Sequence, residues 1–158
     1  AMVITAAEGA NLHLADLKAR AKDFDPTTRD RFLAGTLVPA ALYAQAQRFR
    51  AWYRARVAAL FQEVDVLLAP TTPWVAPLIG APRLAQVGGV EVVARAHSGV
   101  FTQPLSFIGL PVLSVPVEAA GRLPLGVQLV AAPFREPALF RVAARLEAEG
   151  VVAAPVVS

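Results

Sequence analysis

The sequence predicts an α/β fold, in which helices and short strands alternate along the chain. Residues 39–64 carry apolar side chains at steps of three and four, as expected for a long amphipathic helix. Short apolar runs bounded by proline or glycine, such as DVLLA at 65–69 and VLSVPV at 112–117, are typical of buried strands. Both kinds of element recur in one chain, which places it in the α/β class.

The N-terminal third is predicted to be helical. Asn11 can cap a helix that runs to about Ala21. Asp25-Pro26 starts a second helix, because the aspartate accepts backbone N–H groups and proline fits the first turn; this helix should stop near Gly35. In the long helix that follows, Trp52 is predicted to pack in the core beside an apolar stripe. The stripe consists of Leu42, Ala46, Phe49, Tyr53, Val57, Leu60 and Val64.

Loops, strands and short helices are predicted after this helix. Residues 69–82 form a loop, since four prolines prevent a regular ladder. Residues 84–94 form a hairpin around Gly88-Gly89, and residues 98–108 have helical spacing with Ser98 as the N-cap. A turn is predicted at 109–111, followed by strands at 112–117 and 125–132 on either side of a turn at Gly121. The last predicted element is a helix from Glu136-Pro137 to Gly150. Its inward-facing residues are Leu139, Val142, Ala143 and Leu146.

Composition limits the function classes. An apolar content of 56% and a mean hydropathy of +0.50 are high for 158 residues, which suggests that some apolar surface packs against a partner or further chain. The absence of cysteine excludes disulfides and thiolate metal sites, and His13 and His97 lie too far apart for metal-ligand spacing. The net charge of +3 is modest and the arginines are interleaved with acids, which argues against nucleic-acid binding.

The sequence also argues against a membrane-spanning or secreted protein. Residues 96–117 are uncharged and long enough to span a bilayer. They contain Pro104, Pro111 and Pro116, which would repeatedly break the hydrogen-bond ladder of a spanning helix. The first residues, AMVITAAEGANLHL, lack the basic start and apolar core of a signal peptide. We therefore expect a cytoplasmic protein without a membrane partner.

No self-sufficient active site is found in the sequence. Ser98 adjoins His97, but neighbouring residues rarely point at each other, and no glycine elbow presents this serine. The ten glycines are scattered, so there is no phosphate-binding loop. We therefore predict no catalytic residue and no metal ligand in this chain.

Ordered motifs across residues 27–150 resemble those of the amidase-signature enzymes. FTQPLSFIGLPVLSVPV at 101–117 matches a Thr-x-Pro helix start, a Gly-Leu-Pro turn and a Ser-x-Pro strand. LPLGVQLVAAPFREPALFRVAARLE at 123–147 matches Pro-x-Gly-x-Gln followed by a closing amphipathic helix. RDRFLAG, YAQAQRFR and DVLLAPTTP match upstream, in the same order and spacing. The chain is therefore similar to the C-terminal portion of such an enzyme.

The resemblance implies a fold whose chemistry is supplied from outside this chain. It implies a large mixed β-sheet flanked by helices, incomplete here, so that residues 1–158 form a single partial domain. The family cleaves or transfers amides through a serine nucleophile, a second serine in a cis peptide and a lysine, all in an upstream glycine- and serine-rich signature. This chain has no adjacent serine pair, and Lys18 and Lys22 lie outside any such context. No metal or organic cofactor is implied.

The resemblance also points to residues that contact a substrate amide. Arg31 matches an arginine near the substrate amide in the A subunits of tRNA-dependent amidotransferases, where a guanidinium can hold a carboxylate or carbonyl by paired hydrogen bonds. A salt bridge from Arg31 to Asp30 or Asp65 is the structural alternative. Trp74 is a candidate wall of the pocket, with ordinary packing as its alternative.

Three further candidates lie together in the sequence. Gly99 stands where the amidotransferase subunits usually carry an aspartate, which argues against glutamine as the substrate. His97 and Gln103 flank the same loop and can offer polar contacts. The predicted substrate-binding residues are therefore Arg31, His97, Gly99 and Gln103.

Within the family, DFDPTTRDRFLAG, AQAQRFRAWYR and FTQPLSFIGLP are most similar to the carboxybiuret-hydrolase branch. Those enzymes cleave a small nitrogen-rich amide and can require a small partner subunit. Two alternatives remain open: the A subunit of a tRNA-dependent amidotransferase, and a non-catalytic binding module that keeps this part of the fold. Because strands separated from a larger sheet leave open edges and apolar faces, we expect the isolated chain to self-associate or to be marginally stable.

Overall fold

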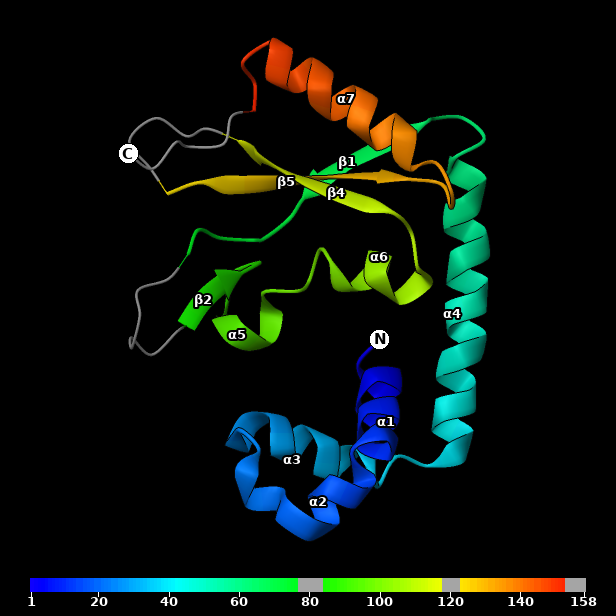
Figure 1. The fold of residues 1–158 in the computed structure, drawn as a ribbon, viewed down its shortest axis with the longest axis vertical. Helices are drawn as coiled ribbons and strands as arrows, with labels where there is room; N and C mark the ends of the chain where they lie inside the picture. The colour runs from blue at the N-terminus through cyan, green and yellow to red at the C-terminus, as the bar shows by residue number, and fades with distance from the viewer. Residues whose placement is uncertain (77–83, 118–122, 153–158) are drawn as a thin grey trace. The chain divides into compact units, whose positions relative to one another are not determined.

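The computed structural model describes residues 1–76, 84–117 and 123–152. The chain divides into two compact units, Ala1–Arg56 and Val57–Ser158. The helices are α1 (Met2–Leu12), α2 (Leu14–Arg20), a short 3₁₀ helix (Ala21–Asp23), α3 (Pro26–Gly35), α4 (Ala40–Leu60), α5 (Ala94–His97), α6 (Gln103–Ile108) and α7 (Glu136–Ala148). The strands are β1 (Val66–Pro70), β2 (Leu84–Val87), β3 (Val90–Val93), β4 (Val112–Val117) and β5 (Leu125–Ala131) (Figure 1).

The chain begins with a helix that the sequence patterns did not predict. Asn11 lies inside α1, so its predicted role as an N-cap is wrong. His13 separates α1 from α2 and makes no side-chain cap hydrogen bond. Its ring stacks on the Phe32 ring, with 5.1 Å between the ring centroids, and packs edge-on against the Phe24 ring, with 5.8 Å between the centroids. Aromatic packing therefore accompanies this junction, where a polar cap was expected.

The predicted start and end of α3 are confirmed. The Asp25 carboxylate accepts the N–H groups of Thr27 and Thr28, each at 3.1 Å, and Pro26 occupies the first turn. The helix ends at Gly35, which is buried. These two features are local in sequence, which is why the sequence alone predicts them.

Asp25→Ala is expected to lower the free energy of unfolding by about 1 kcal/mol, because two backbone N–H groups lose their acceptor. Urea denaturation followed by circular dichroism measures this change. Asp25→Asn is the matched control, since it keeps a side-chain oxygen as acceptor and should cost clearly less. Equal losses in the two variants would assign the effect to the negative charge at the helix N-terminus.

The long helix α4 is confirmed, but its apolar stripe is largely uncovered. Val57 is the buried member, whereas Leu42, Phe49 and Leu60 are exposed. Trp52 is 55% exposed, so its predicted place in the core is wrong. Helical spacing fixes which side chains share a face, but a second element must cover that face before it becomes core.

The C-terminal unit is built on a three-stranded sheet in the order β1-β5-β4. Both ladders are antiparallel, with Leu68 and Leu113 as the Cα partners of Leu129. No parallel pair occurs among the described strands. Helices flank this sheet, which confirms the α/β class. β1 and β4 are the edges of the sheet, and the last described residues add a single bridge between Val117 and Val152.

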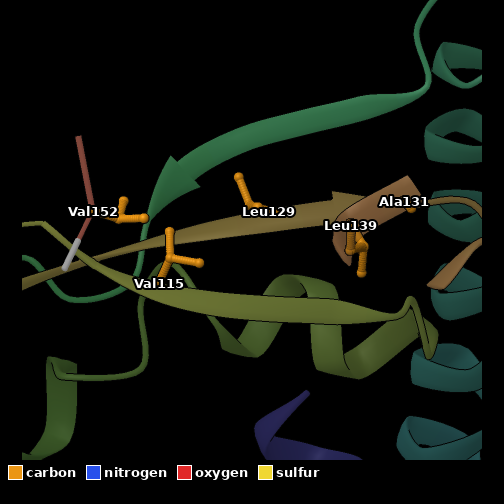
Figure 2. Packing of buried hydrophobic residues seen from close by; sticks show 5 residues of the cluster. All are labelled: Val115, Leu129, Ala131, Leu139 and Val152. Carbon is orange, nitrogen blue, oxygen red and sulfur yellow. The ribbon is translucent and has the colours of Figure 1, made fainter. Parts of the chain in front are cut away.

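The two faces of the sheet are occupied by different segments of the unit. α7 lies over one face, while α5 and α6 lie on the other side (Figure 1). Alternation along β5 directs Leu129 and Ala131 to the α7 face and Gln128 to the opposite face. Figure 2 shows Leu129 on β5, Val115 on β4 and Leu139 on α7, which belong to one buried cluster. Val142, Ala143 and Leu146 pack against this cluster, as predicted.

The hairpin and the turn before β4 are confirmed. β2 and β3 pair in antiparallel fashion around Gly88 and Gly89, both of which have positive φ, as the tightest hairpin turns require. Gly109 ends α6 in the left-handed conformation, with φ 71°. Ser98 follows α5 as its last cap residue, so its predicted role as an N-cap is wrong. Residues 77–82 of the predicted loop and the turn around Gly121 lie outside the described residues.

Candidate functional site

Arg31 lies on α3 with an exposed side chain. Neither Asp30 nor Asp65, its two expected partners, forms a salt bridge with Arg31. Asp30 pairs with Arg29, Nε to Oδ1 at 3.0 Å, and Asp65 lies 3.8 Å from Arg135. Among the described residues, the Arg31 guanidinium therefore has no ion-pair partner. It belongs to the N-terminal unit, whereas His97, Gly99 and Gln103 belong to the C-terminal unit.

Residues 97–103 join α5 to α6. We call them the substrate loop because they contain three of the four predicted substrate-binding residues. The Gly99 carbonyl accepts the N–H groups of Thr102 at 3.2 Å and Gln103 at 2.8 Å. The Val100 N–H donates to the His97 carbonyl at 3.1 Å, so the loop is closed by local turns. His97 Nδ1 lies 3.1 Å from the Val93 carbonyl, which holds the imidazole against the end of β3.

The structure brings Gly99 and Gln103 into contact. A Cβ added at Gly99 would lie 3.1 Å from Cγ and 3.3 Å from Nε2 of Gln103. The Gln103 side chain therefore fills the space that any larger residue at position 99 would enter. An aspartate at this position would require Gln103 to move.

Gln128 is the one buried polar residue among the described residues, at 1% exposure, and it is not among the predicted site residues. Its Nε2 donates to the Pro70 carbonyl at 2.8 Å and to the Phe101 carbonyl at 3.0 Å. The signal was present in the sequence, because a glutamine within the apolar run LGVQLVAA must find hydrogen-bond partners when that strand is buried.

Gly126 precedes Gln128 on the same face of β5 and permits a close approach. The Thr71 N–H donates to the Gly126 carbonyl at 2.9 Å, and the hydroxyls of Thr71 and Ser114 lie 3.1 Å apart. A Cβ at Gly126 would lie 2.9 Å from the Thr71 hydroxyl oxygen and 3.2 Å from that of Ser114. The glycine and glutamine of the Pro-x-Gly-x-Gln motif therefore both serve contacts with the segment after β1.

The site offers hydrogen-bonding groups suited to an amide. The Gln103 side chain carries both donors and an acceptor, and the His97 ring can donate or accept. Within residues 1–76, 84–117 and 123–152, no three His, Asp or Glu side chains are grouped so as to hold a metal ion. In the same part of the chain, no helix is both long and apolar enough to cross a membrane.

Comparison with known families decides the assignment. The family model described as Amidase matches residues 2–140. The chain belongs to the amidase family. This confirms the resemblance carried by the ordered motifs, and it places both α3 with Arg31 and the substrate loop inside the matched region.

Two curated relatives show where this amidase chain lies within the family. It is 47% identical over 154 residues to the AtzE subunit of the 1-carboxybiuret hydrolase of Pseudomonas sp. (strain ADP), covering 96% of the chain and 33% of the relative. It is 38% identical over 136 residues to the A subunit of the glutamyl-tRNA(Gln) amidotransferase of Parvibaculum lavamentivorans, covering 82% of the chain and 26% of the relative. The amidase chain thus spans about a third or less of the length of these relatives.

Solved structures confirm the fold. The chain superposes with a TM-score of 0.89 and 45% identity on an inhibitor-bound structure described as a vestigial protein complex that reveals the evolutionary origins of an s-triazine catabolic enzyme, covering 96% of this chain and 33% of that one. A crystal structure of an amidase matches with a TM-score of 0.86 and 27% identity, covering 94% and 34%. The amidase chain therefore shares its arrangement of helices and sheet with part of these proteins.

Proposed function

We propose that this chain is the C-terminal portion of an amidase that hydrolyses a C–N bond of a small linear carboxamide. The observation that carries the proposal is that 96% of the chain aligns, at 47% identity, with a 1-carboxybiuret hydrolase subunit. The serine nucleophile, the cis-peptide serine and the lysine come from the upstream portion, because that is where the family's signature lies. Residues 1–158 then form one partial domain of the whole enzyme.

In this proposal, the chain supplies core strands and the loops that line the substrate pocket. Arg31, His97, Gly99 and Gln103 contact the substrate. The exposed guanidinium of Arg31 is available to a carbonyl or carboxylate oxygen. The side-chain amide of Gln103 can donate to the substrate carbonyl and accept from its N–H groups. Gly99 admits Gln103 into this position, since a larger residue would meet its side chain.

The A subunit of a tRNA-dependent amidotransferase is the less favoured alternative. The amidotransferase relative named above and its homologues share 34% to 38% identity with this chain, below the 47% of the carboxybiuret hydrolase relative. Gly99 also replaces the aspartate that those subunits usually carry, and Gln103 occupies the adjoining space. A non-catalytic binding module is a second alternative, which the presence of an upstream serine-rich signature in the reading frame would remove.

The proposal includes partners for the uncovered surfaces. The apolar stripe of α4 is exposed at Leu42, Phe49 and Leu60, and β1 and β4 are edges of the described sheet. In the whole enzyme, we assign the cover to the upstream portion and to a small partner subunit. Without them, we expect the isolated chain to self-associate or to be marginally stable. A relative's structure is described as a vestigial protein complex, which supports a partner of this kind. A cytoplasmic location stays a prediction.

Ammonia release tests the proposed function. The purified 158-residue chain is expected to release no ammonia above buffer from 1-carboxybiuret, biuret or glutamine. The longer gene product that includes the upstream signature should release ammonia from 1-carboxybiuret in preference to glutamine. A preference for glutamine would support the amidotransferase alternative. Turnover by the 158-residue chain itself, lost in Ser98→Ala or His97→Ala, would show that the chemistry lies within this chain.

A further inference from the structure

One buried side chain joins three separate segments of the C-terminal unit. Gln128 lies in the central strand β5, and its two bonds reach Pro70 at the end of β1 and Phe101 in the substrate loop. Both distances, 2.8 Å and 3.0 Å, are those of well-formed hydrogen bonds, and the residue is 1% exposed. Its amide nitrogen carries two N–H groups, and the structure provides one carbonyl for each.

We propose that Gln128 is a positioning residue that fixes the substrate loop against the end of β1. The effect that this positioning has on substrate binding and catalysis rests on the proposed function. Phe101 stands midway between Gly99 and Gln103, so holding its carbonyl fixes the backbone from which both candidate substrate contacts project. The bond to Pro70 holds the start of the segment that carries Trp74, the candidate pocket wall.

A glutamine side chain can donate hydrogen bonds to both carbonyls, whereas side chains of similar size or chemistry cannot. A glutamate side chain at position 128 would direct carboxylate oxygens at two carbonyl oxygens, which are all acceptors. Methionine matches the length but has no N–H group, so both hydrogen bonds to the carbonyls are lost. Asparagine keeps the donors but is one methylene shorter, so we expect it to lose at least one of the two bonds.

The hydrogen bonds of Gln128 lie on the opposite face of the sheet from the main apolar core. Leu129, Ala131 and Leu139 pack on the α7 face, and this packing stabilises the sheet itself. Gln128 points to the other face, where its partners are backbone groups outside any strand ladder or at the end of one. Such segments open locally at low cost unless a tertiary contact holds them. Loss of Gln128 should therefore release the substrate loop before it unfolds the sheet.

Hydrogen exchange on the 158-residue chain tests the positioning role without any enzymatic assay. In Gln128→Met, the amides of Val100, Thr102 and Gln103 are expected to exchange at least about tenfold faster than in the wild type, while the β4–β5 ladder keeps its protection. Leu139→Ala is the control, because it removes a buried side chain of the α7 face. Its loss of protection should spread over the sheet and α7. The same pattern in both variants would overturn the proposal.

Gln128→Asn keeps the test decisive if Gln128→Met does not fold. This milder variant should show exchange in the substrate loop between those of the wild type and Gln128→Met, with the sheet still protected. If the loop amides of Gln128→Asn exchanged as slowly as those of the wild type, both bonds would not be needed and the proposal would be overturned.

Steady-state kinetics of the longer gene product with 1-carboxybiuret tests the consequence for substrate binding. Gln128→Asn is expected to raise KM by about tenfold with kcat within about twofold, the pattern of lost binding shared by ground and transition state. A merely structural role would lower kcat through a smaller folded fraction and leave KM unchanged, and that result would overturn the proposal. If the wild type turns over no amide, the proposed function fails, while the exchange measurement still decides whether Gln128 fixes the loop.

Discussion

Gly35→Ala is expected to lower the free energy of unfolding of the N-terminal unit by about 3 kcal/mol, the upper part of the range for overpacking. A Cβ at this position would lie 2.1 Å from the Ala6 carbonyl oxygen, 2.6 Å from its carbonyl carbon and 2.9 Å from Ala10 Cβ. Two of these atoms belong to the backbone of α1, so no side-chain rotation relieves the contact. The helices α1 and α3 must move apart, which loosens the packing around the buried Ile4 and Ala10.

Hydrogen exchange resolved by segment measures this effect, since α1 and α3 should lose protection while β5 keeps it. Gly150→Ala is the matched control. It makes the same chemical change where nothing lies within 4 Å, but at φ +69°. Its cost should be about 1–2 kcal/mol from backbone strain and should be confined to the end of α7. Unchanged protection of α1 in Gly35→Ala would contradict the close approach of the two helices.

Leu129→Ala is expected to cost about 4 kcal/mol, within the range for removing a large buried aliphatic side chain. Leu129 is 0% exposed and lies in the central strand among Val115, Ala131, Leu139 and Val152 (Figure 2). Whole domains are stable by only about 5–15 kcal/mol, so this variant should be partly unfolded at moderate urea concentration. The shift of the urea midpoint at fixed protein concentration measures the loss.

Leu68→Ala is the control for Leu129→Ala, because the same atoms are removed from the Cα partner on the neighbouring strand. Leu68 is 61% exposed, so its replacement should change the free energy of unfolding by about 0.5 kcal/mol or less. Comparable losses for the two leucines would show that the exposed edge β1 is covered in solution. Self-association through that edge would be the first explanation to test.

The sequence alone determined the features that depend on neighbours in the chain. The Asp25-Pro26 helix start, the Gly88-Gly89 hairpin and the turn at Gly109 follow from the conformations that these residues allow, and the structure confirms each. The apolar periods also gave the long helix and the strands, since spacing along the chain sets which side chains share a face. The ordered motifs alone carry the resemblance to the family, because they depend only on residue types and their spacing along the chain.

Tertiary structure decided what the local patterns left open. Trp52 and most of the α4 stripe are exposed, because burial depends on a second element that covers the face. Asn11 lies inside α1, and α2 starts after His13, whose ring packs on Phe32 from α3. The role of Gln128 depends on carbonyls 58 and 27 residues away in sequence, which only folding brings within hydrogen-bond distance. A glutamine within an apolar run indicates from the sequence that hydrogen-bond partners are needed, but only the fold determines which groups they are.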